Sequence, residues 1–502
     1  MNEINNRLKK FVQDIEKSKQ YFLKYIKNYN SPIHIYTHID ADGLSAGAIL
    51  GKALYREKLP FQITILRQLE KEEIIKIAEN AFSNLMIFSD FGSGQYLELQ
   101  KELLLRSHDK HFIILDHHLP QKISDKKDFK AIEDIHIETN PWHINPYFYR
   151  IDGSNEISGA GVCYYFAKAL NKSNIDLSKI AIIGAIGDIQ NQGSNKSFSG
   201  FNSFILEDCK NAGLIEVVDD LNFSLIKPLN EAIAYSSDIK LPGLSSDANK
   251  TLKFLKTLGI LMENADGSVR TLNEMNRDEK QKISSAIIEY ATIKLNIDPN
   301  EIIGRLIVNR YLLTDENNSE LHDVEDFSNL LNACGRTDNG SLGIAIAMGD
   351  RKNSFEQAKQ SLINYKNSLL TALTWINEKE KIQHKKYIQY FFGEDVVPEN
   401  IVGTISSMLI LDEGNKLDKT KPIFGCALRI DEDVYKISGR AHEKIVAKGV
   451  NLSEAIREAL TLSKLETLGG GHPPAAGTKV PSNKINIFLD NLDKVIEKQL
   501  NF

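Results

Sequence analysis

The chain has few cysteines, and none of them are spaced as the closely paired cysteines of a metal-binding or redox motif. Four cysteines are scattered over 502 residues without a C-x-x-C spacing: Cys163, Cys209, Cys334 and Cys426. Isolated thiols of this kind are typical of reduced proteins inside the cell and argue against a disulfide framework. We therefore expect a cytoplasmic protein that is stabilised by its own hydrophobic core.

Long apolar runs and an excess of positive charge are also missing. No apolar run approaches the length that spans a bilayer, and the N-terminus lacks the apolar core of a signal peptide. The formal net charge of -6 argues against a general nucleic-acid coat, although it leaves room for a local basic groove. The sequence contains neither an internal repeat nor a low-complexity tail. We expect no membrane partner.

What the chain does contain is a regular alternation of short apolar runs and helical stretches over its first 200 residues. The expected strands are 33–37, 62–66, 85–89, 112–116 and 131–137. The expected helices are 4–29, 44–54 and 157–170. Alternation of this kind predicts a mostly parallel sheet and an α/β fold class.

The later part of the chain changes character twice. Residues 200–300 carry helical patterns, and β-rich runs return at 305–308, 342–347, 423–428 and 434–437. Helices are expected over 354–381 and 485–500. We therefore predict an α/β domain over 1–200, a helical connector or cap over 201–302, and a second α/β domain over 303–502.

Carboxylates and imidazoles gather where four largely apolar runs end. These residues are His38, Asp40, Asp42, Asp90, Asp116, His117, His118 and Asp188. The carboxyl ends of the strands of an open α/β sheet are where ligands bind. In an extended segment, residues two apart face the same side, so the first three could share one site before Gly43 turns the chain into a helix.

Carboxylate oxygens mixed with imidazole nitrogens suit Mn²⁺, Fe²⁺ or Zn²⁺ better than Ca²⁺. Carboxylates can bridge two ions about 3.5–4 Å apart, and such pairs catalyse phosphoryl displacement. Each residue also has a plainer interpretation: Asp90 or Asp188 could cap a helix, and His38 could be a structural histidine. Asp116 could orient an imidazole instead of binding metal. The joint pattern favours a metal site.

These residues resemble the DHH phosphoesterase superfamily, which is named after the triplet at Asp116–His118. The segment 38–43 is similar to its first motif in the RecJ-type form, Asp90 to its second and Asp188 to its fourth. In the C-terminal half, Gly469–Gly477 is similar to the G-G-G-H signature of the associated substrate-binding domain, and Lys436–Arg440 to its basic K-x-S-x-R strand.

Within the superfamily the chain is most similar to archaeal RecJ-like exonucleases of the GINS-associated nuclease type, because of the segments 330–336 and 403–408. The resemblance implies two Mn²⁺ ions, with Mg²⁺ as an alternative, and implies that His118 faces the scissile phosphate. The implied metal ligands are His38, Asp40, Asp42, Asp90, His117 and Asp188. It also implies single-stranded DNA or RNA as substrate and the GINS replication complex as a partner.

The second half has the residue types that hold phosphate. A glycine run leaves backbone N–H groups open to an anion, and the planar arginine fork grips phosphate in two places. The expected substrate-binding residues are Arg440, Ser438, Lys436, Gly469, Gly470, Gly471, His472 and Arg336, and Lys444 and Lys448 could extend a basic track. A tight turn before Pro473 and a solvated charged face are the alternatives.

The function that these patterns favour is a metal-dependent exonuclease that hydrolyses single-stranded DNA or RNA from an end, in replication or repair. One alternative is a phosphodiesterase for short oligonucleotides or cyclic dinucleotides, which would use the same centre. Another is a scaffold of a replication complex with little activity, against which the intact metal motifs argue.

Overall fold

The computed structural model describes residues 2–28, 31–80, 82–104, 110–121, 141–236, 238–245, 247–316, 320–411, 417–467 and 469–500. The chain forms two compact units, Met1–Ala358 and Lys359–Phe502. The strand expected over 131–137 lies outside the described residues. The division of the chain at residues 200 and 302 stays a prediction.

A parallel sheet forms the centre of the first unit, as the alternating pattern predicted. Its strand order is β2-β1-β3-β4-β5, and every neighbouring pair is parallel. The strands are β1 (Ile33–His38), β2 (Phe61–Leu66), β3 (Leu85–Ser89), β4 (His111–Leu115) and β5 (His143–Ile144). The chain leaves β1 toward β2 and then continues on the other side with β3, so the strand order reverses between β1 and β3. Ligands bind at such a reversal point in open α/β sheets.

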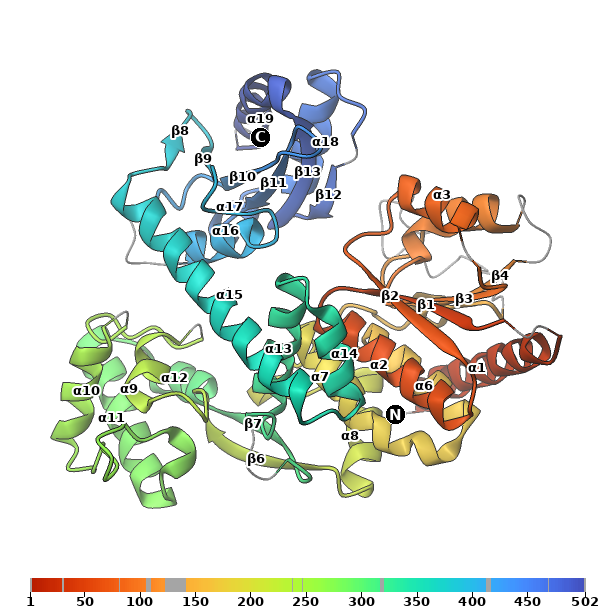
Figure 1. Cartoon of the computed structure of the whole chain (residues 1–502). Helices are drawn as coiled ribbons and strands as arrows, with labels where there is room; N and C mark the ends of the chain where they lie inside the picture. Colours follow the sequence, from red (N-terminus) through yellow and green to blue (C-terminus); the bar gives the residue numbers. More distant parts are fainter. Residues whose placement is uncertain are drawn as a thin grey trace. The chain divides into compact units, whose positions relative to one another are not determined.

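Helices cover both faces of this sheet, which explains why β3 and β4 are almost wholly apolar. Figure 1 shows α3 (Lys71–Asn80) on one side and α2 (Ala41–Arg56) and α6 (Gly159–Leu170) on the other. The long helix α1 (Asn2–Asn28) buries Phe11 and Phe22 completely, and Phe22 packs edge-on against Phe166 of α6.

Two apolar runs whose patterns predicted strands are helices. The run before Asp188 is α7 (Ser178–Gly187), and the run 342–347 lies in α14 (Gly340–Met348). Nearly every residue of α7 is buried, so its sequence is apolar all round. Such a run has no helical period that would distinguish it from a buried strand.

The rest of the first unit is mainly helical. Among the described residues, the other α-helices of this unit are α4 (Tyr96–Leu99), α8 (Gly200–Asn211), α9 (Leu229–Ala234), α10 (Ala248–Thr257), α11 (Arg277–Leu295), α12 (Pro299–Leu306) and α13 (Val324–Arg336). An antiparallel ribbon of β6 (Ile215–Leu221) and β7 (Ile307–Leu313) flanks the segment that contains α9 to α12. That segment has its own core, with Leu229, Leu255, Leu272 and Ile283 fully buried. The expected run 305–308 therefore straddles the end of α12 and the start of β7.

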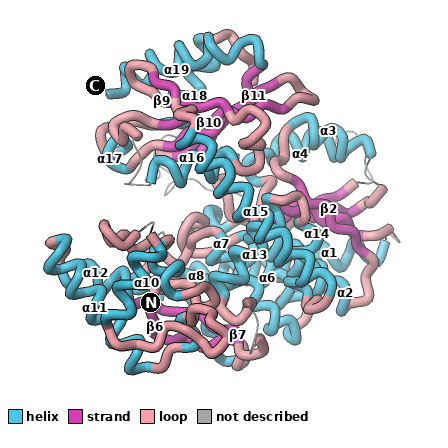
Figure 2. Tube along the Cα trace, turned by 60° about the vertical axis from the view of Figure 1, so that its left-hand side comes forward, coloured by secondary structure: helices cyan, strands magenta, loops and turns pink. Residues whose placement is uncertain are grey.

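The second unit is built on a mixed sheet with the order β12-β13-β11-β10-β9-β8. Its strands are β8 (Gln383–His384), β9 (Gln389–Phe392), β10 (Ile423–Arg429), β11 (Val434–Arg440), β12 (Gly469–His472) and β13 (Ala475–Pro481). Its helices are α16 (Val402–Leu411), α17 (Glu443–Val446), α18 (Leu452–Leu462) and α19 (Ile485–Leu500), and α15 (Asn353–Glu378) leads into it. Figure 2 shows α18 and α19 on one side of this sheet and α16 on the other.

In the part of the chain that the structure describes, no helix combines the length and the apolar character that crossing a membrane requires.

Candidate metal centre

The first three expected ligands come together around a helix start rather than along an extended segment. His38 ends β1, Asp40 is the N-cap of α2, and Asp42 lies in the first turn of that helix. The Asp40 carboxylate accepts a hydrogen bond from the Gly43 N–H at 3.0 Å and lies 2.9 Å from Nδ1 of His38. The expectation of an alternating strand was wrong, although the convergence that it predicted is present.

Gly43 makes this tight start possible. A Cβ atom on Gly43 would lie 2.4 Å from the carbonyl oxygen of His38, closer than any side chain can approach. The absent side chain therefore lets the helix begin directly beside the end of the strand.

Asp42 is buried against the start of a second helix. Its carboxylate accepts hydrogen bonds from the backbone N–H groups of Gly159 at 2.7 Å and Ala160 at 3.0 Å, in the first turn of α6. A Cβ atom on Gly184 of α7 would lie 2.5 Å from Oδ1 of Asp42. The positive end of the α6 dipole thus holds one buried carboxylate, and a glycine of α7 makes room for it.

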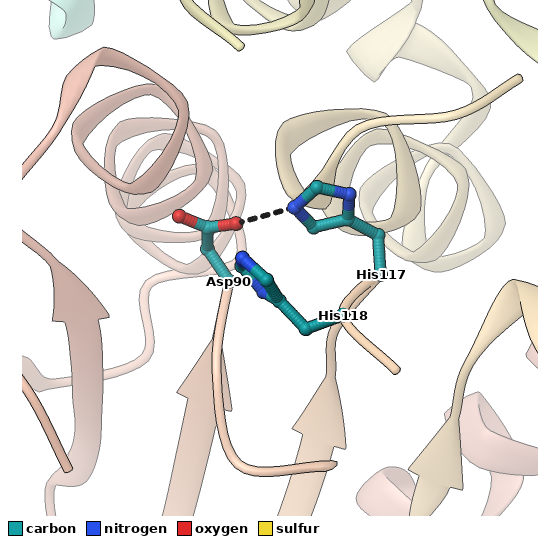
Figure 3. Close-up of side chains that lie close together, drawn as sticks. All are labelled: Asp90, His117 and His118. Carbon is teal, nitrogen blue, oxygen red and sulfur yellow. Dashed lines mark ion pairs between the residues drawn. The ribbon is translucent and has the colours of Figure 1, made fainter. Parts of the chain in front are cut away.

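Asp90 follows β3 and faces the imidazole of His117, as Figure 3 shows. Its Oδ1 atom lies 3.1 Å from Nε2 of His117, and its Oδ2 atom lies 3.5 Å from Nδ1 of His38. The Asp90 backbone is left-handed, with φ of 63°, and its side chain is 1% exposed. Among the described residues, neither carboxylate oxygen makes a well-aligned hydrogen bond, although each lies near one of these imidazole nitrogens.

His117 presents one specific nitrogen to this cluster. Its Nδ1 atom lies 2.6 Å from the carbonyl oxygen of Gly153, which can only accept, so Nδ1 carries the proton of that bond. Nε2 therefore faces Asp90 and Asp42, the latter at 3.7 Å. Asp188, the C-cap of α7, comes within 3.8 Å of the Nδ1 side of the ring.

Asp116 and His118 form a separate pair at the edge of the cluster. The buried Asp116 carboxylate accepts bonds from the backbone N–H groups of Ser93, His117 and His118. It also lies 2.9 Å from Nδ1 of His118, whose side chain is 53% exposed. Asp116 thus orients the ring of His118, which points toward Asp90 and His117 in Figure 3.

Burial and crowding shift the acidities of these groups. Burial raises the pKa of Asp42, and the carboxylates of Asp90 and Asp188 raise it further, to well above its ordinary value. Burial alone would lower the pKa of His117, but the carboxylates of Asp188, Asp90 and Asp42 outweigh it and hold that pKa well above the usual range. Burial likewise opposes the effect of Asp40 and Asp90 on His38, whose pKa is raised as well. The cluster therefore gathers protons that a cation would displace.

The donor set fits divalent cations. Three overlapping groups of side chains could each hold an ion: His38 with Asp40 and Asp90; Asp42 with His117 and Asp188; and Asp90 with His117 and His118. Among the described residues, no other group of His, Cys, Asp or Glu side chains is arranged to hold an ion. Buried carboxylate oxygens without well-aligned hydrogen bonds are costly unless a positive charge neutralises them, and both oxygens of Asp90 are of this kind. The cluster lies at the carboxyl end of the sheet, beside the reversal between β1 and β3.

The expected phosphate-binding residues lie in the second unit. Lys436, Ser438 and Arg440 are on β11, and Gly469 to His472 form the edge strand β12, with Gly470, Gly471 and His472 exposed. Arg440 is held by Ser407 of α16, whose hydroxyl accepts from its Nε atom at 2.7 Å. Arg336, by contrast, is in the first unit, at the exposed end of α13.

Several polar residues around the cluster are not predicted by any motif in the sequence. Gly153, Gln190 and Asn202 bond to the expected ligands or to one another, and Asn145 donates to the carbonyl of His118 at 2.8 Å. Gln190 stands two positions after Asp188, which is the only local signal for it. The others are distant in sequence and reach the centre through the fold alone.

The chain matches three family models in order along its length. They are the N-terminal domain of the DHH family over residues 32–187, the DHH-CID domain over 225–307 and the DHHA1 domain over 385–498. It is 33% identical to an uncharacterized protein of Methanocaldococcus jannaschii over 97% of this chain and 99% of that protein.

Solved structures share the fold. A crystal structure of the exonuclease RecJ bound to manganese matches with a TM-score of 0.54 at 15% identity, over 96% of this chain and 94% of that one. The crystal structure of CDC45 from Entamoeba histolytica matches with a TM-score of 0.63 at 13% identity, over 96% of this chain and 99% of that one.

Together, the fold and the cluster of carboxylates and imidazoles define a metal-dependent hydrolase of the phosphoesterase class. The three matching models begin at residue 32, just before β1, and end at residue 498 in α19. The chain belongs to the DHH family, and it shares its fold with RecJ.

Proposed function

We propose that this protein is a Mn²⁺-dependent exonuclease that hydrolyses single-stranded DNA or RNA from an end. The single observation that carries the proposal is the position of Asp90, whose buried carboxylate lies between the imidazoles of His38 and His117. A carboxylate in that place is suited to bridge two ions. RecJ, whose crystal structure is described as that of an exonuclease bound to manganese, shares the fold and supports the assignment.

In this proposal the ligands divide into two sets. His38, Asp40 and Asp90 would hold one ion, and Asp42, His117 and Asp188 would hold the other. Asp90 also faces His117, so its carboxylate would be available to the second ion as well. Two bound ions supply the Lewis acidity that activates water and stabilises both oxygens of an in-line phosphoryl displacement. Mg²⁺ is the alternative cation, since it also prefers carboxylate oxygens.

His118 acts on the phosphate rather than on the ions. Asp116 fixes the ring through Nδ1 and stabilises its cationic form, because it opposes the effects of burial and of His117 and raises the pKa of His118. The Nε2 atom then donates a hydrogen bond to a phosphate oxygen and stabilises the charge that develops during displacement.

In this proposal, residues of the second unit bind phosphates of the nucleic acid. Arg440 offers a planar fork that Ser407 holds in place, and Lys436 and Ser438 lie on the same strand. The exposed glycines of β12 bring backbone groups to an anion without side chains in the way. Arg336 is a further proposed phosphate contact, and the GINS replication complex is a proposed partner.

A phosphodiesterase for short oligonucleotides or cyclic dinucleotides is the second candidate, because the same centre would serve it. A replication scaffold with little activity is a third, and the shared fold of CDC45 is the observation that favours it. The complete ligand set argues for catalysis.

The test is a digestion series in Mn²⁺ with 5′- and 3′-labelled single strands of DNA and RNA, alongside a dinucleotide. We expect single nucleotides to be released progressively from one end of the long strand, and no release by Asp90→Asn. Cleavage of the dinucleotide alone would favour the second candidate. Equal inactivity of the wild type and Asp90→Asn on every substrate would overturn the enzyme assignment.

A further inference from the structure

A buried amide side chain joins two of the proposed metal ligands. Gln190 is 1% exposed and follows Asp188 by two positions. Its Nε2 atom donates to Oδ2 of Asp188 at 2.7 Å and to the carbonyl oxygen of Gly153 at 2.8 Å. That carbonyl is the one that accepts from Nδ1 of His117. The NH₂ group of Gln190 therefore contacts Asp188 directly and shares the Gly153 carbonyl with His117.

Asn202, which contacts the oxygen of the Gln190 amide, sets the orientation of that amide. Oε1 of Gln190 accepts from Nδ2 of Asn202 on α8 at 2.7 Å, and Asn202 is fully buried. If the Gln190 amide turned over, its oxygen would face a carboxylate and a carbonyl, and its NH₂ group would face another NH₂ group. Its bonds to Asp188, Gly153 and Asn202 would be lost together, so Asn202 specifies the orientation of Gln190.

The backbone delivers Gln190 to this position by an unusual turn. The Gln190 N–H donates to Ala185 at 2.9 Å, and the Ile189 N–H donates to Ile186 at 3.0 Å, which closes the C-terminus of α7 in a Schellman motif. The left-handed position of that motif usually holds glycine. Here Ile189 occupies it, with φ of 55°. The turn brings Asp188 and Gln190, which flank Ile189, to the same cluster.

Asn202 is not placed for stability alone. Its Oδ1 atom is buried and has no hydrogen-bond partner among the residues that the structure describes. A buried acceptor without a donor destabilises a fold and calls for another explanation. Directing the NH₂ group of Gln190 at Asp188 and Gly153 is such an explanation.

We propose that Gln190, oriented by Asn202, is a positioning residue for the metal centre: it fixes the carboxylate of Asp188 and, through the Gly153 carbonyl, the imidazole of His117. The inference rests on the proposed function of the cluster as a metal site. It predicts that Gln190 sets how tightly a cation is bound, although Gln190 itself binds none. Partners behind the ligands typically change metal affinity about 10–100-fold.

The test measures Mn²⁺ binding directly, by isothermal titration and by the Mn²⁺ electron paramagnetic resonance spectrum of the full chain. Gln190→Met keeps the length of the side chain and removes its hydrogen bonds, and we expect Mn²⁺ to bind about 10–100-fold more weakly, with a broadened spectrum. Asn202→Ala leaves the Gln190 amide free to turn, and we expect a smaller change in the same direction. The two effects should not add in the double variant, because both act through one amide.

Asn174 provides the matched control. It is also fully buried, and it donates to Ala167 at 2.9 Å and accepts from Arg56 at 2.7 Å. Asn174→Ala should lower the melting temperature and leave Mn²⁺ affinity unchanged.

The outcomes separate this inference from the function on which it rests. Failure of the wild type to bind Mn²⁺ would overturn the proposed metal site, and this inference with it. Tight wild-type binding together with equal affinity in folded Gln190→Met would overturn the positioning role alone. If Gln190→Met does not fold, Asn202→Ala decides by the same measurement, and unchanged affinity there overturns the role.

Discussion

The Nδ1 atom of His118 lies 2.9 Å from Oδ1 of Asp116, a carboxylate that is fully buried and also accepts three backbone N–H groups. Asp116 lies at the edge of the cluster, so we expect it to act by orienting His118. Its environment stabilises the ionised form: burial alone would raise the pKa of Asp116, but the neighbouring His118 and His117 outweigh burial and hold that pKa well below the usual range.

Replacing this carboxylate should damage turnover more than metal binding. In Asp116→Asn, the new NH₂ group faces N–H groups that donated hydrogen bonds to the carboxylate. His118 therefore loses its fixed orientation and its charged partner. We expect hydrolysis of a phosphodiester to fall about 10–100-fold. Mn²⁺ affinity, measured by titration, should stay within a few-fold. A rate equal to that of the wild type would show that His118 needs no orienting partner.

Gly184 should tolerate no side chain. A Cβ atom there would lie 2.5 Å from Oδ1 of Asp42 and 2.6 Å from Cβ of Ala160. We expect Gly184→Ala to cost about 1–3 kcal/mol of unfolding free energy and to weaken Mn²⁺ binding. The control is Gly304→Ala in α12, where nothing lies within 4 Å, and which should gain about 0.5–1 kcal/mol. Denaturant unfolding of the two variants would contradict this account if they behaved alike.

Ile189 stores strain beside the cluster. It is a β-branched residue in the left-handed region, with φ of 55°, and its side chain is 65% exposed. We expect Ile189→Gly to stabilise the fold by about 0.5–1 kcal/mol, because glycine adopts this conformation without a Cβ penalty. Ile189→Ala keeps a Cβ atom and should gain less. Thermal unfolding would refute the strain if glycine lowered the melting temperature.

Asp326, in the first turn of α13, should make stability depend on pH. Burial, followed by the Asp323 carboxylate, raises the pKa of Asp326 to about 7. The folded state therefore binds a proton between about pH 4 and 7 that the unfolded state releases, so this group lowers stability as pH rises through that window. Asp326→Asn removes the effect. Its stability relative to the wild type should increase from pH 5 to pH 8 by on the order of 2–3 kcal/mol. Parallel pH profiles from chemical unfolding would contradict this.

The sequence predicted the parts of the fold that depend on half-buried or short apolar patterns. The strands β1 to β4 were expected within a residue of their observed ends, because each apolar run is short and bounded by polar residues. Helix α7 was mistaken for a strand end, since a fully buried helix has no polar face to reveal its period. Asp188 was nevertheless placed correctly at the cluster, because its carboxylate follows the apolar run whichever element forms it.

The surroundings of the ligands were beyond the reach of the sequence. Gly159 and Gly184 make room for carboxylates that precede them by more than 60 residues, and Asn202 reaches Gln190 from another helix. No local period or motif announces such contacts, because they arise only when distant segments pack. The roles of the ligands themselves are predictions that mutagenesis must test.

The central claim, that the cluster around Asp90 is a two-ion centre, is tested most directly by titrating the metal-free chain with Mn²⁺. We predict two ions per chain in the wild type, a higher melting temperature on binding, and loss of both effects in Asp90→Asn, whose carboxylate lies between His38 and His117. Wild-type protein that bound no Mn²⁺, or an Asp90→Asn variant that still bound two ions with unchanged affinity, would contradict the account.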